Sequence, residues 1–518
     1  MSSTAVSGGV ARFLAALTGA LYFAAFPGLD WWPVAFIAYV PLVIALIGRD
    51  PKQGLWLGWI AGFTMNALGF YWIPGMLARF SGFGWSSCIA LSLLFWLYQG
   101  LRGGLMGWLL CRAIRRGWPL SLGVTSAFLA SEQLFPLLFP WFFAATMHRV
   151  PLMMQTADLG GPLLVGLILV AANLVFAEPV LAILRARPVR FRTLLFPLSL
   201  VCSAAVYGGL RIPQIDKELA RATQIDVGLV QANLGLIGKR RDVDRGLKEH
   251  LSLTKQLLSD GLLDLVVWSE TSVMRPIAER ELAVQVPLAI SGKLGVPAIF
   301  GAVSYRPVQD ARKYQLFNSA LATDAQGTVR GRYDKHFLVP FSERIPWGDR
   351  YPALYRWSPN SLRISPGESL EPLPIGDHSV ATTICYEDLS PSFVNTMLRR
   401  ANAGLLVNLS NDAWFGDTLE PHQHSALAKL RAVEQRRFLI RSTNSGISAF
   451  IDPVGRTLAQ TLPFSQQTLR HRVAWLTEET LYRRVGEWVL WALSILGLVT
   501  AWLPRPKRMQ HIGTATPT

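Results

Sequence analysis

Ile384-Cys385-Tyr386-Glu387-Asp388 closes a β-prone run that begins at Val380, and it holds the only cysteine between residues 211 and 518. The other three cysteines lie in long apolar stretches, at Cys88, Cys111 and Cys202. A cysteine at the end of a predicted strand, with no disulfide partner in the same polar region, is a candidate nucleophile. Together with the apolar stretches elsewhere in the chain, this segment predicts an acyl-transferring enzyme built on a membrane platform.

The composition changes along the chain. Of its 518 residues, 51% are hydrophobic and 16% are charged, and a mean hydropathy of +0.30 is too high for a single soluble protein. The apolar residues gather at the two ends, whereas the middle resembles an ordinary globular domain. We therefore expect an N-terminal transmembrane domain over residues 1–215, an extracytoplasmic catalytic domain over 220–482, a C-terminal transmembrane helix over 487–503 and a cytoplasmic tail over 504–518.

Eight apolar ranges are long enough for membrane spans, because a bilayer core takes about 20 apolar helical residues, or about 17 at the least. The first range alone has the length of a signal peptide, but six more follow it before the polar domain. The sequence therefore predicts a multipass α-helical membrane domain with spans at residues 11–27, 31–48, 55–74, 86–111, 120–141, 160–184, 193–210 and 487–503.

Basic residues gather in alternate connections between these ranges, and such residues near span ends stay on the cytoplasmic side. The inner connections and the tail contain Arg49, Lys52, Arg112, Arg115, Arg116, Arg185, Arg187, Arg190, Arg192, Arg505, Lys507 and Arg508. The outer connections have far fewer, such as Arg79 and Arg149. This pattern predicts both termini inside and the polar domain outside. Much of the formal net charge of +16 thus reflects topology rather than nucleic-acid binding.

Two features within the predicted spans concern helix packing and polarity. A small-xxx-small spacing, which lets helix backbones approach closely in lipid, occurs at Gly100, Gly103, Gly104 and Gly107. Arg102 in the same span and Glu132 in the next carry charges that are costly at membrane depth. Either both side chains reach water at an interface, or they line a polar cleft that admits a lipid headgroup. The sequence leaves both alternatives open.

Short β-prone runs recur in the polar domain, with helix-compatible stretches between several of them. The runs are Ile225–Leu234, Leu263–Trp268, Val296–Val303, Leu316–Ala322, Val380–Ile384, Leu405–Leu409 and Ile447–Ile451. The helical stretches are Asp242–Asp260, Glu279–Leu294 and His422–Arg441. This alternation predicts an α/β layered domain. Asp452-Pro-Val-Gly-Arg456 is typical of the turn of a terminal hairpin.

Three residues at or near strand ends have the chemistry for thioester formation. Glu270 ends one apolar run, Cys385 ends another, and Lys335 lies in the segment Arg332–Glu343. A thiol becomes a good nucleophile when a base takes its proton, and a partly buried carboxylate can be that base. An ammonium group can stabilise the developing oxyanion. Each residue taken singly also fits an exposed carboxylate, a surface lysine or a buried cysteine.

The local motifs resemble the nitrilase (carbon–nitrogen hydrolase) superfamily. They are Trp268-Ser-Glu270, Tyr333-x-Lys-x-x-Leu-Val-Pro-Phe-x-Glu343, Ile384-Cys-Tyr-Glu387 and Asn411-Asp-Ala-Trp-Phe-Gly416. With eight predicted spans and an outer domain, the chain resembles the apolipoprotein N-acyltransferase family of bacteria. Further matching segments are Gln423-His424, Arg431-Ala-x-Glu434 and Arg441-Ser-Thr-Asn-Ser-Gly446. The resemblance covers almost the whole chain and implies a nitrilase-like α-β-β-α sandwich domain with a Glu-Lys-Cys triad.

The resemblance implies a two-step reaction. Cys385 would attack the sn-1 ester of a phospholipid, usually phosphatidylethanolamine, and the resulting thioester would pass its acyl chain to the α-amine of a diacylglyceryl-cysteine on an apolipoprotein. Glu270 would be the general base and Lys335 would stabilise the oxyanion. The family uses four further positions to support the site or bind substrate. In this chain they are Glu343, Tyr386, Glu387 and Trp414.

The resemblance also implies a cellular location and binding partners. We expect a protein of the bacterial inner membrane with its catalytic domain on the periplasmic side, a phospholipid donor, an apolipoprotein acceptor and no nucleic acid. We expect a monomer, because one chain contains both the membrane platform and the triad. Neither an organic cofactor nor a metal is expected. His422 and His424 lack the further ligands of a zinc site.

Two segments leave substrate detail open. Arg240 stands where the family commonly has a tryptophan, and Trp268-Ser-Glu270 replaces the more usual Trp-Pro-Glu. The first change is either drift in a loop or a change in substrate preference or activity. Residues 341–357 interleave aromatic side chains with arginines, which suits a membrane interface. This arm either rests on the outer leaflet and controls access to Cys385 or is a packed surface loop.

Two rival functions use the same residues. A membrane-tethered amidase or nitrilase would let water complete the reaction, but a tether needs only one span. A non-catalytic scaffold would retain the domain without its chemistry, and the complete set Glu270, Lys335 and Cys385 argues against this alternative. The chain contains no Gly-x-Ser-x-Gly elbow and no Walker phosphate loop, which disfavours a serine lipase and an ATP-driven transporter.

Overall fold

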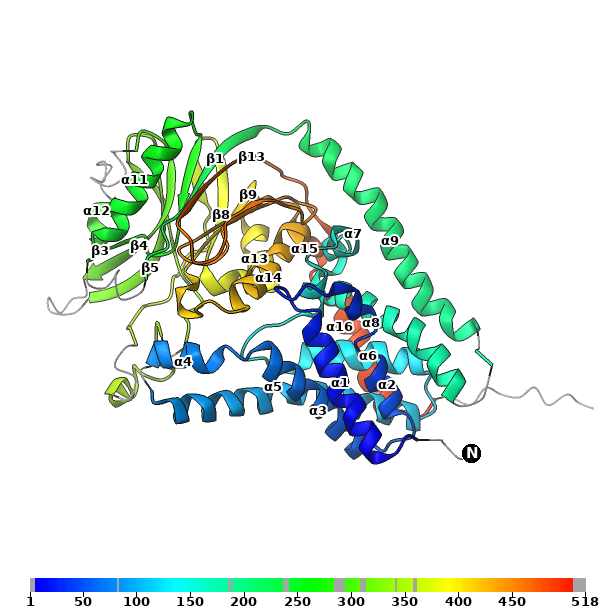
Figure 1. Cartoon of the computed structure of the whole chain (residues 1–518). Helices are drawn as coiled ribbons and strands as arrows, with labels where there is room; N and C mark the ends of the chain where they lie inside the picture. Colours follow the sequence, from blue (N-terminus) through cyan, green and yellow to red (C-terminus); the bar gives the residue numbers. More distant parts are fainter. Residues whose placement is uncertain are drawn as a thin grey trace, which may run out of the picture.

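The computed structural model describes residues 5–81, 83–184, 188–189, 191–235, 242–283, 294–307, 314–340, 342–356 and 361–505. A helix bundle lies beside a domain that contains the sheets (Figure 1). The long helix α9 (Phe191–Leu219) runs from the bundle toward the first strand, β1 (Gln224–Gln231). The bundle and the sheet domain are therefore separate in architecture but connected through a continuous helix.

The bundle contains helices from both ends of the chain. Besides α9 they are α1 (Gly8–Ala24), η1 (Trp32–Phe36), α2 (Val40–Leu46), α3 (Pro51–Gly69), α4 (Ile73–Ser81), α5 (Trp85–Arg115), α6 (Leu120–Leu134), η2 (Phe143–Met147), α7 (Pro151–Met154), α8 (Ala157–Leu184), α15 (Leu481–Val485) and α16 (Trp488–Trp502). Among the described residues, three helices are long and apolar enough to cross a membrane: α5, α8 and α9. The count of eight spans stays a prediction.

The predicted span over residues 31–48 is not one continuous helix. It consists of the short helix η1, a turn and the short helix α2. Pro33 and Pro41 stand in the first turn of each piece, where a residue without an N–H group is tolerated but cannot continue a preceding helix. The predicted span 55–74 covers most of α3 and the first two residues of α4, and each of the remaining predicted spans overlaps a single helix.

Helices α3 and α5 approach each other closely along a line of glycines. A Cβ atom placed on Gly58 would lie 2.1 Å from the carbonyl oxygen of Gly103, and one on Gly54 would lie 2.5 Å from that of Gly107. Side chains at these positions would push the helices apart. The small-residue spacing in the sequence therefore serves helix packing, as predicted.

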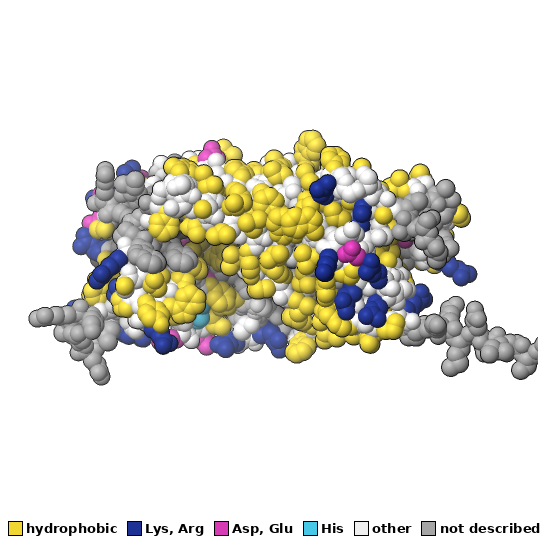
Figure 2. Space-filling view, turned by 90° about the horizontal axis from the view of Figure 1, so that it is seen from below, with side chains coloured by type: hydrophobic (Ala, Val, Ile, Leu, Met, Phe, Trp, Pro, Cys, Tyr) yellow, Lys and Arg dark blue, Asp and Glu magenta, His cyan; other side chains and the backbone are white. Residues whose placement is uncertain are grey.

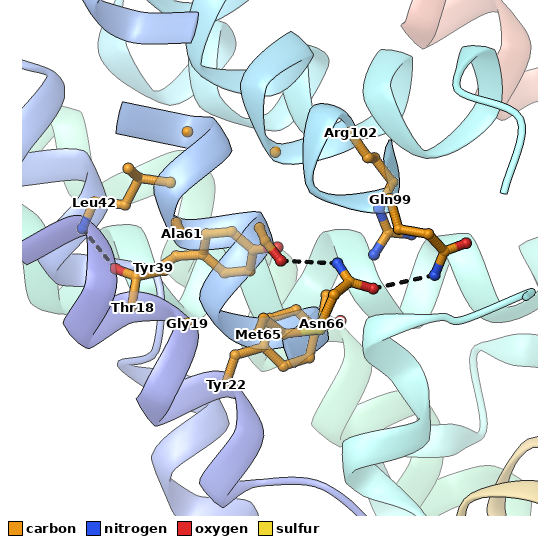
Figure 3. Close-up of a pocket in the computed structure, with 13 residues that line it drawn as sticks. Thr18, Gly19, Tyr22, Tyr39, Leu42, Ala61, Met65, Asn66, Gln99 and Arg102 are labelled. Carbon is orange, nitrogen blue, oxygen red and sulfur yellow. Dashed lines mark hydrogen bonds between the residues drawn. The ribbon is translucent and has the colours of Figure 1, made fainter. Parts of the chain in front are cut away.

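Arg102 and Glu132 point into the bundle. Arg102 Nη1 lies 3.1 Å from Glu132 Oε1 and donates a hydrogen bond to the carbonyl oxygen of Trp141 at 2.9 Å. The adjoining cavity, lined by Tyr22, Asn66 and other residues shown in Figure 3, has a volume of about 30 Å³. A space of this size holds about one water molecule. The structure thus supports neither sequence-based alternative: the charges neutralise each other in the interior, and a headgroup does not fit beside them.

The ends of several helices meet at one end of the bundle, which is rich in arginine. Arg112 Nε donates to the carbonyl oxygen of Ala501 at 2.8 Å, the backbone N–H of Arg505 donates to Arg116 at 3.0 Å, and Arg49 donates to Val6. In Figure 2, lysine and arginine side chains gather toward the right of the view, next to a broad hydrophobic surface. The sheet domain contacts the opposite end of the bundle.

The sheet domain contains two sheets in its described residues. The first has seven strands: β1, β2 (Leu265–Trp268), β3 (Val273–Ala278), β4 (Ala298–Pro307), β5 (Tyr314–Thr323), β6 (Val329–Asp334) and β13 (Gln467–Ala474). The second has six strands: β7 (Leu373–Ile375), β8 (His378–Ile384), β9 (Leu405–Ser410), β10 (Leu439–Thr443), β11 (Ala449–Ile451) and β12 (Thr457–Gln460). Every predicted β-run overlaps one of these strands.

The two sheets face each other across one apolar core. Val267 and Ile299 of the first sheet and Val407 and Ile440 of the second belong to this core. Helices cover the outer faces: α11 (Arg245–Ser259) and α12 (Glu279–Ala283) lie on the first sheet, and α13 (Pro391–Arg400) and α14 (Glu420–Gln435) lie on the second (Figure 1). The architecture is the expected α-β-β-α sandwich.

Two sequence-based boundaries need correction. The helical stretch predicted for His422–Arg441 ends at Gln435, because Arg436 adopts a left-handed conformation with φ of 49° and the chain continues as β10. The turn at Asp452–Arg456 joins the antiparallel strands β11 and β12, but β13 follows and pairs with β1. That hairpin is therefore not terminal. Most of the helical stretch predicted for Glu279–Leu294 lies outside the described residues.

Candidate active site

Cys385 lies directly after β8, at the first position of the short helix η5 (Cys385–Leu389). Its φ of 53° is left-handed, a conformation that a non-glycine residue rarely adopts and that is common at functional sites. The residue is 9% exposed. Burial, followed by the charge of Glu270, raises the pKa of the Cys385 thiol well above its usual value, against the opposing effect of Lys335. The resting thiol therefore keeps its proton and needs a base.

Lys335 lies between two carboxylates that come from different parts of the chain. Its Nζ is 3.2 Å from Glu270 Oε1, just after β2, and 3.0 Å from the carboxylate of Glu343. Asn318 on β5 donates to both carboxylates, at 2.7 and 2.9 Å. Burial opposes the positive charge of Lys335, but Glu270 and Glu343 raise its pKa well above its usual value. The side chain is therefore a fixed cation next to Cys385.

Glu387 connects the Cys385 turn to the segment that carries Lys335. Its Oε1 accepts from the backbone N–H groups of His336 and Phe337 at 2.6 and 3.1 Å. Its Oε2 accepts from the N–H of Ile384 and from Tyr333 Oη, both at 2.8 Å. Burial raises the pKa of Glu387 to about 7, although these N–H donors lower it. Four donors on one carboxylate fix the distance between the nucleophile and the lysine.

Tyr386 and Trp414 lie where the sheet domain meets the helix bundle. Tyr386 Oη donates to the carbonyl oxygen of Leu138 at 3.2 Å, and its ring contacts Phe139 with centroids 5.6 Å apart. The carbonyl oxygen of Trp414 accepts from Arg79 Nη1 at 3.2 Å. The structure thus brings together Glu270, Lys335, Glu343, Cys385 and Glu387, whereas Tyr386 and Trp414 connect this group to the bundle.

The bundle contacts the sheet domain at several further points beside the site. Trp72 Nε1 donates to Gln423 Oε1 at 3.2 Å, and Gln423 Nε2 donates to the carbonyl oxygen of Gly69 at 2.8 Å. The rings of Trp72 and Phe415 have centroids 5.3 Å apart. These contacts hold the segment between α3 and α4 against α14 and the loop that precedes it.

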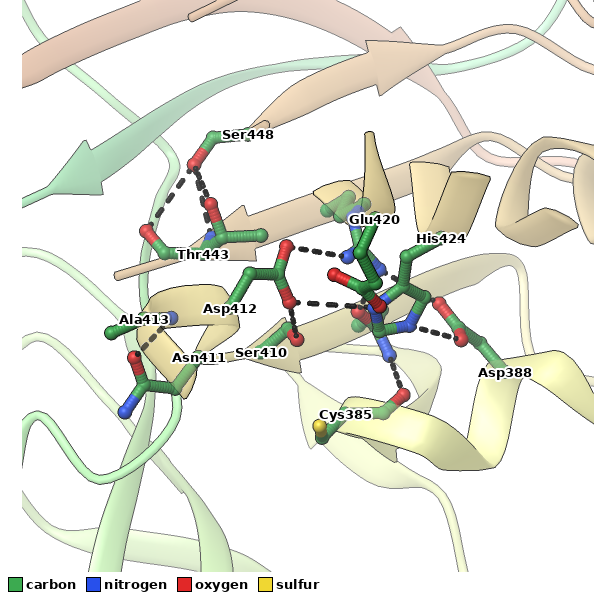
Figure 4. A network of polar contacts seen from close by, with 12 residues as sticks. Cys385, Asp388, Ser410, Asn411, Asp412, Ala413, Glu420, His424, Thr443 and Ser448 are labelled. Carbon is green, nitrogen blue, oxygen red and sulfur yellow. Dashed lines mark hydrogen bonds and ion pairs between the residues drawn. The ribbon is translucent and has the colours of Figure 1, made fainter. Parts of the chain in front are cut away.

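A second charged network, shown in Figure 4, lies behind Cys385. His424 Nε2 is 3.0 Å from Asp388 Oδ1, and His424 Nδ1 is 3.3 Å from Asp412 Oδ1. Arg441 lies 3.0 Å from Asp388 Oδ2 and 3.1 Å from Asp412 Oδ2. All four side chains are fully buried. The sequence motifs contain these residues but gave no sign that they meet.

The same network offers three ligand atoms within 4.8 Å of one another, from Asp412, Glu420 and His424. These residues do not fit a metal ion, because Arg441 already places a positive charge at Asp412. Burial and Arg441 oppose a charge on His424, but Asp388 and Asp412 raise its pKa to about 10. The imidazole is therefore protonated at neutral pH and has no lone pair for a metal.

Asn318 is a further site residue that sequence reasoning missed. It is a polar side chain within the apolar run Leu316–Ala322, and that interruption was the available signal. Arg240 lies outside the described residues. Of the arm at 341–357, the described part begins at the site and leads to Trp347, which is 76% exposed. Control of access by this arm stays a prediction.

Comparisons with known proteins identify the family of the chain. Residues 18–175 match the family model for the apolipoprotein N-acyltransferase N-terminal domain, and residues 226–476 match that for carbon-nitrogen hydrolase. An apolipoprotein N-acyltransferase of Allorhizobium ampelinum is 31% identical over 478 residues, which cover 86% of each chain. The chain belongs to the apolipoprotein N-acyltransferase family.

Other relatives extend the match over nearly the whole length. The apolipoprotein N-acyltransferase of Geobacter metallireducens is 27% identical over 512 residues, or 96% of each chain. Among solved structures, Saccharomyces cerevisiae Nit3, a member of branch 10 of the nitrilase superfamily, is 16% identical with a TM-score of 0.38 and covers 51% of this chain and 95% of its own. The family model over residues 18–175 and the full-length relative show that the match includes the helix bundle.

Proposed function

We propose that the chain is a phospholipid-dependent N-acyltransferase that moves an acyl chain through a Cys385 thioester to the α-amine of the diacylglyceryl-cysteine of apolipoproteins. One observation carries the proposal: a cysteine in a left-handed turn adjoins a buried lysine held between two carboxylates, at the junction with an apolar helix bundle. Family membership supports the same activity.

The domain arrangement belongs to this proposal. Residues 1–215 form a transmembrane domain with seven spans, 220–482 a periplasmic catalytic domain, 487–503 an eighth span and 504–518 a cytoplasmic tail. The basic end of the bundle, where Arg112, Arg116 and Arg505 gather, is the cytoplasmic end. Connections at the opposite end contact the sheet domain, through Trp72, Arg79 and Leu138. The protein works in the bacterial inner membrane as a monomer.

In the first step Glu270 takes the proton from the Cys385 thiol as the sulfur attacks the sn-1 ester carbonyl of a phospholipid, with phosphatidylethanolamine as the donor. Lys335 has three N–H donors, and two of them face Glu270 and Glu343. The third stabilises the oxyanion of the tetrahedral intermediate. The carbon–oxygen bond then breaks, Glu270 returns its proton to the leaving oxygen, and lysophospholipid departs.

In the second step the α-amine of the acceptor attacks the thioester. Glu270 removes a proton from the attacking amine, Lys335 again stabilises the oxyanion, and the bond from carbon to sulfur breaks. The proton on Glu270 then restores the thiol of Cys385. Both steps need one base, one fixed cation and one nucleophile, and they need no cofactor.

The supporting residues act in different ways. Glu343 keeps Lys335 charged and in place, and Glu387 holds the Cys385 turn against the segment after Lys335. Tyr386 and Trp414 lie at the bundle and position the turn and its neighbouring loop next to the lipid. We assign the last two residues to substrate access rather than to chemistry.

The decisive experiment is an intact-mass spectrum of the detergent-purified protein after incubation with phosphatidylethanolamine. We expect a hydroxylamine-sensitive acyl adduct that maps to Cys385 and disappears when a diacylglyceryl peptide with a free amine is added. Release of free fatty acid without amine acylation would indicate a hydrolase instead. A folded protein with an alkylatable Cys385 but no adduct from any phospholipid would contradict the proposal and favour a scaffold.

A further inference from the structure

The turn that contains Cys385 is held by residues from three other elements. A left-handed conformation at a cysteine persists only where its surroundings fix it, and the φ of Cys385 is 53°. The carbonyl oxygen of Cys385 accepts a hydrogen bond from Asn408 Nδ2, on β9, at 3.1 Å. At the other end of the turn, Asp388 contacts His424 on α14 and Arg441 on β10.

Arg441 reaches both ends of this turn with one guanidinium group. Its Nη1 donates to Asp388 Oδ2 at 3.0 Å and to Asn408 Oδ1 at 2.8 Å. Asn408 in turn donates to the carbonyl oxygen of Cys385. Asp388 is therefore bound directly and Cys385 is bound through one intervening amide. The planar guanidinium has several donors in a fixed geometry, which a lysine cannot reproduce.

The surroundings of Arg441 fix its position. Asp412 Oδ2 accepts from Arg441 Nη2 at 3.1 Å, and Asp412 Oδ1 accepts from Ser410 at 2.8 Å. Figure 4 shows Asp412, His424 and Glu420 converging on this region behind Cys385. Burial, followed by the charge of Asp412, raises the pKa of Glu420 well above its usual value, and Glu420 Oε1 lies 3.7 Å from His424 Nδ1. Arg441 and His424 each contact both Asp388 and Asp412 in this closed site.

We propose that Arg441 is a positioning residue for the nucleophile: by bridging Asp388 and Asn408 it holds the Cys385–Leu389 turn so that the thiol faces Glu270 and Lys335. Arg441 is fully buried, and its guanidinium donates to Asp388, Asn408 and Asp412. It reaches the backbone of Cys385 through Asn408. The inference rests on the proposed role of Cys385 as the nucleophile.

Arg437 is a matched control on the same segment. Like Arg441 it is fully buried, and its guanidinium donates to the carbonyl oxygens of Ala403 and Glu478 at 2.7 and 2.8 Å and to Asn402 Oδ1 at 2.8 Å. All of these acceptors lie away from the Cys385 turn. A general loss of stability from replacing a buried arginine should therefore be similar in Arg437→Lys and Arg441→Lys, whereas a loss of positioning should occur only in the second.

The experiment compares these two variants in the full-length protein reconstituted with phosphatidylethanolamine. We expect Arg441→Lys to lower kcat about 100-fold, the loss typical of a misplaced reacting group, with KM for the phospholipid nearly unchanged. Arg437→Lys should keep kcat within about threefold of the parent, since it leaves that geometry intact. Equal losses in both variants, or a change confined to KM, would overturn the proposal.

Thiol alkylation separates this inference from the proposed function. Iodoacetamide labelling of Cys385, mapped on its peptide, should slow about tenfold in Arg441→Lys relative to the parent, while Arg437→Lys should label at the parent's rate. This readout needs no acyl transfer. If the parent forms no acyl adduct but the labelling difference remains, the proposed function fails and the positioning role stands. Unchanged labelling of Cys385 would contradict the positioning role alone.

Asn408→Leu supplies a second test if Arg441→Lys does not fold. This change removes the donor to the Cys385 carbonyl oxygen and leaves the contacts of Arg441 with Asp388 and Asp412 in place. We expect the same pattern of lower kcat, nearly constant KM and slower labelling of Cys385. Parent-like kcat and labelling in Asn408→Leu would overturn the bridge through Asn408, and with it the proposal.

Discussion

Two buried charged clusters flank Cys385, and they differ in charge balance. In the catalytic cluster one ammonium group, Lys335, faces the two carboxylates of Glu270 and Glu343. In the network behind the turn, Arg441 and His424 each contact both Asp388 and Asp412, and Glu420 lies 3.7 Å from His424. An excess of negative charge raises the pKa of a thiol and suits proton transfer, whereas a balanced cluster suits a fixed position. In the proposed function, chemistry and positioning thus use separate clusters.

The largest expected effect comes from removing members of the catalytic cluster. Cys385→Ala should abolish acyl transfer, and Glu270→Gln and Lys335→Ala should each lower kcat by about 10³-fold or more, because the three residues act as a unit. Acylation of a diacylglyceryl peptide measures the effect, and membrane insertion should be unchanged. Normal turnover by Cys385→Ala would end the assignment of the nucleophile.

Glu343→Gln should give a smaller loss within the same cluster. The change removes one of the two carboxylates that hold Lys335, and we expect kcat to fall about 10- to 100-fold, as for other residues that orient a reacting group. Because the charge of Glu343 also raises the pKa of Cys385, the thiol should be alkylated at lower pH in this variant. The control is Glu279→Gln, a carboxylate paired with Arg306 away from the site. Identical alkylation profiles in the two variants would contradict the electrostatic role of Glu343.

His424 should make the stability of the protein depend on pH. Its pKa is about 10 in the folded protein against an ordinary value of 6.5, so its stabilising effect is complete below pH 6.5 and is lost as pH rises toward 10. The unfolding temperature of the parent should therefore fall over this range more steeply than that of His424→Gln. Parallel curves for the two proteins would show that the imidazole does not carry the charge.

Substitutions of the buried ion pair in the helix bundle should have the smallest effect on catalysis. Removing one partner of the buried pair, as in Glu132→Leu, should destabilise the protein by roughly 3–5 kcal/mol, because it leaves an unpaired charge. The double change Arg102→Met with Glu132→Leu should recover most of this stability, and acyl transfer should stay close to that of the parent. Thermal unfolding in detergent and the acylation assay measure both. A loss of activity in a stable double variant would give the pair a functional role.

Local patterns predicted most of the sheet domain, and the family motifs named Glu270, Lys335 and Glu343, which the structure brings together. Each β-run found in the sequence overlaps a strand, since buried strands are continuously apolar over short ranges. The second apolar range was harder to interpret, because hydropathy does not register the break between Phe36 and Val40 that Pro33 and Pro41 accompany. The end of α14 depends on the left-handed Arg436, which tertiary contacts with Asp158 hold in place.

The network around Arg441 could not be predicted from local patterns. Asp388, Asn408 and Arg441 are separated by about 20 to 50 positions in the chain, and only the parallel pairing of β8, β9 and β10 brings them together. Asn318 is similar, because its contacts with Glu270 and Glu343 depend on the folding of β5 beside the ends of other strands. Sequence motifs identify which residue types are present, but the topology of the sheets decides which of them meet.

The strands at the two ends of the sheet domain are neighbours. Gln224, at the start of β1, pairs with Ala474, at the end of β13, and the backbone N–H of Trp475 donates to Thr223 at 2.9 Å. The polypeptide thus enters and leaves the domain at a single point, like an insertion with adjacent ends. Such a unit can be exchanged as a cassette: a water-soluble homologue joined at these two positions would leave the spacing between α9 and α15 unaltered. Chimeras of this kind would separate what the membrane helices contribute to substrate choice from what the sandwich contributes.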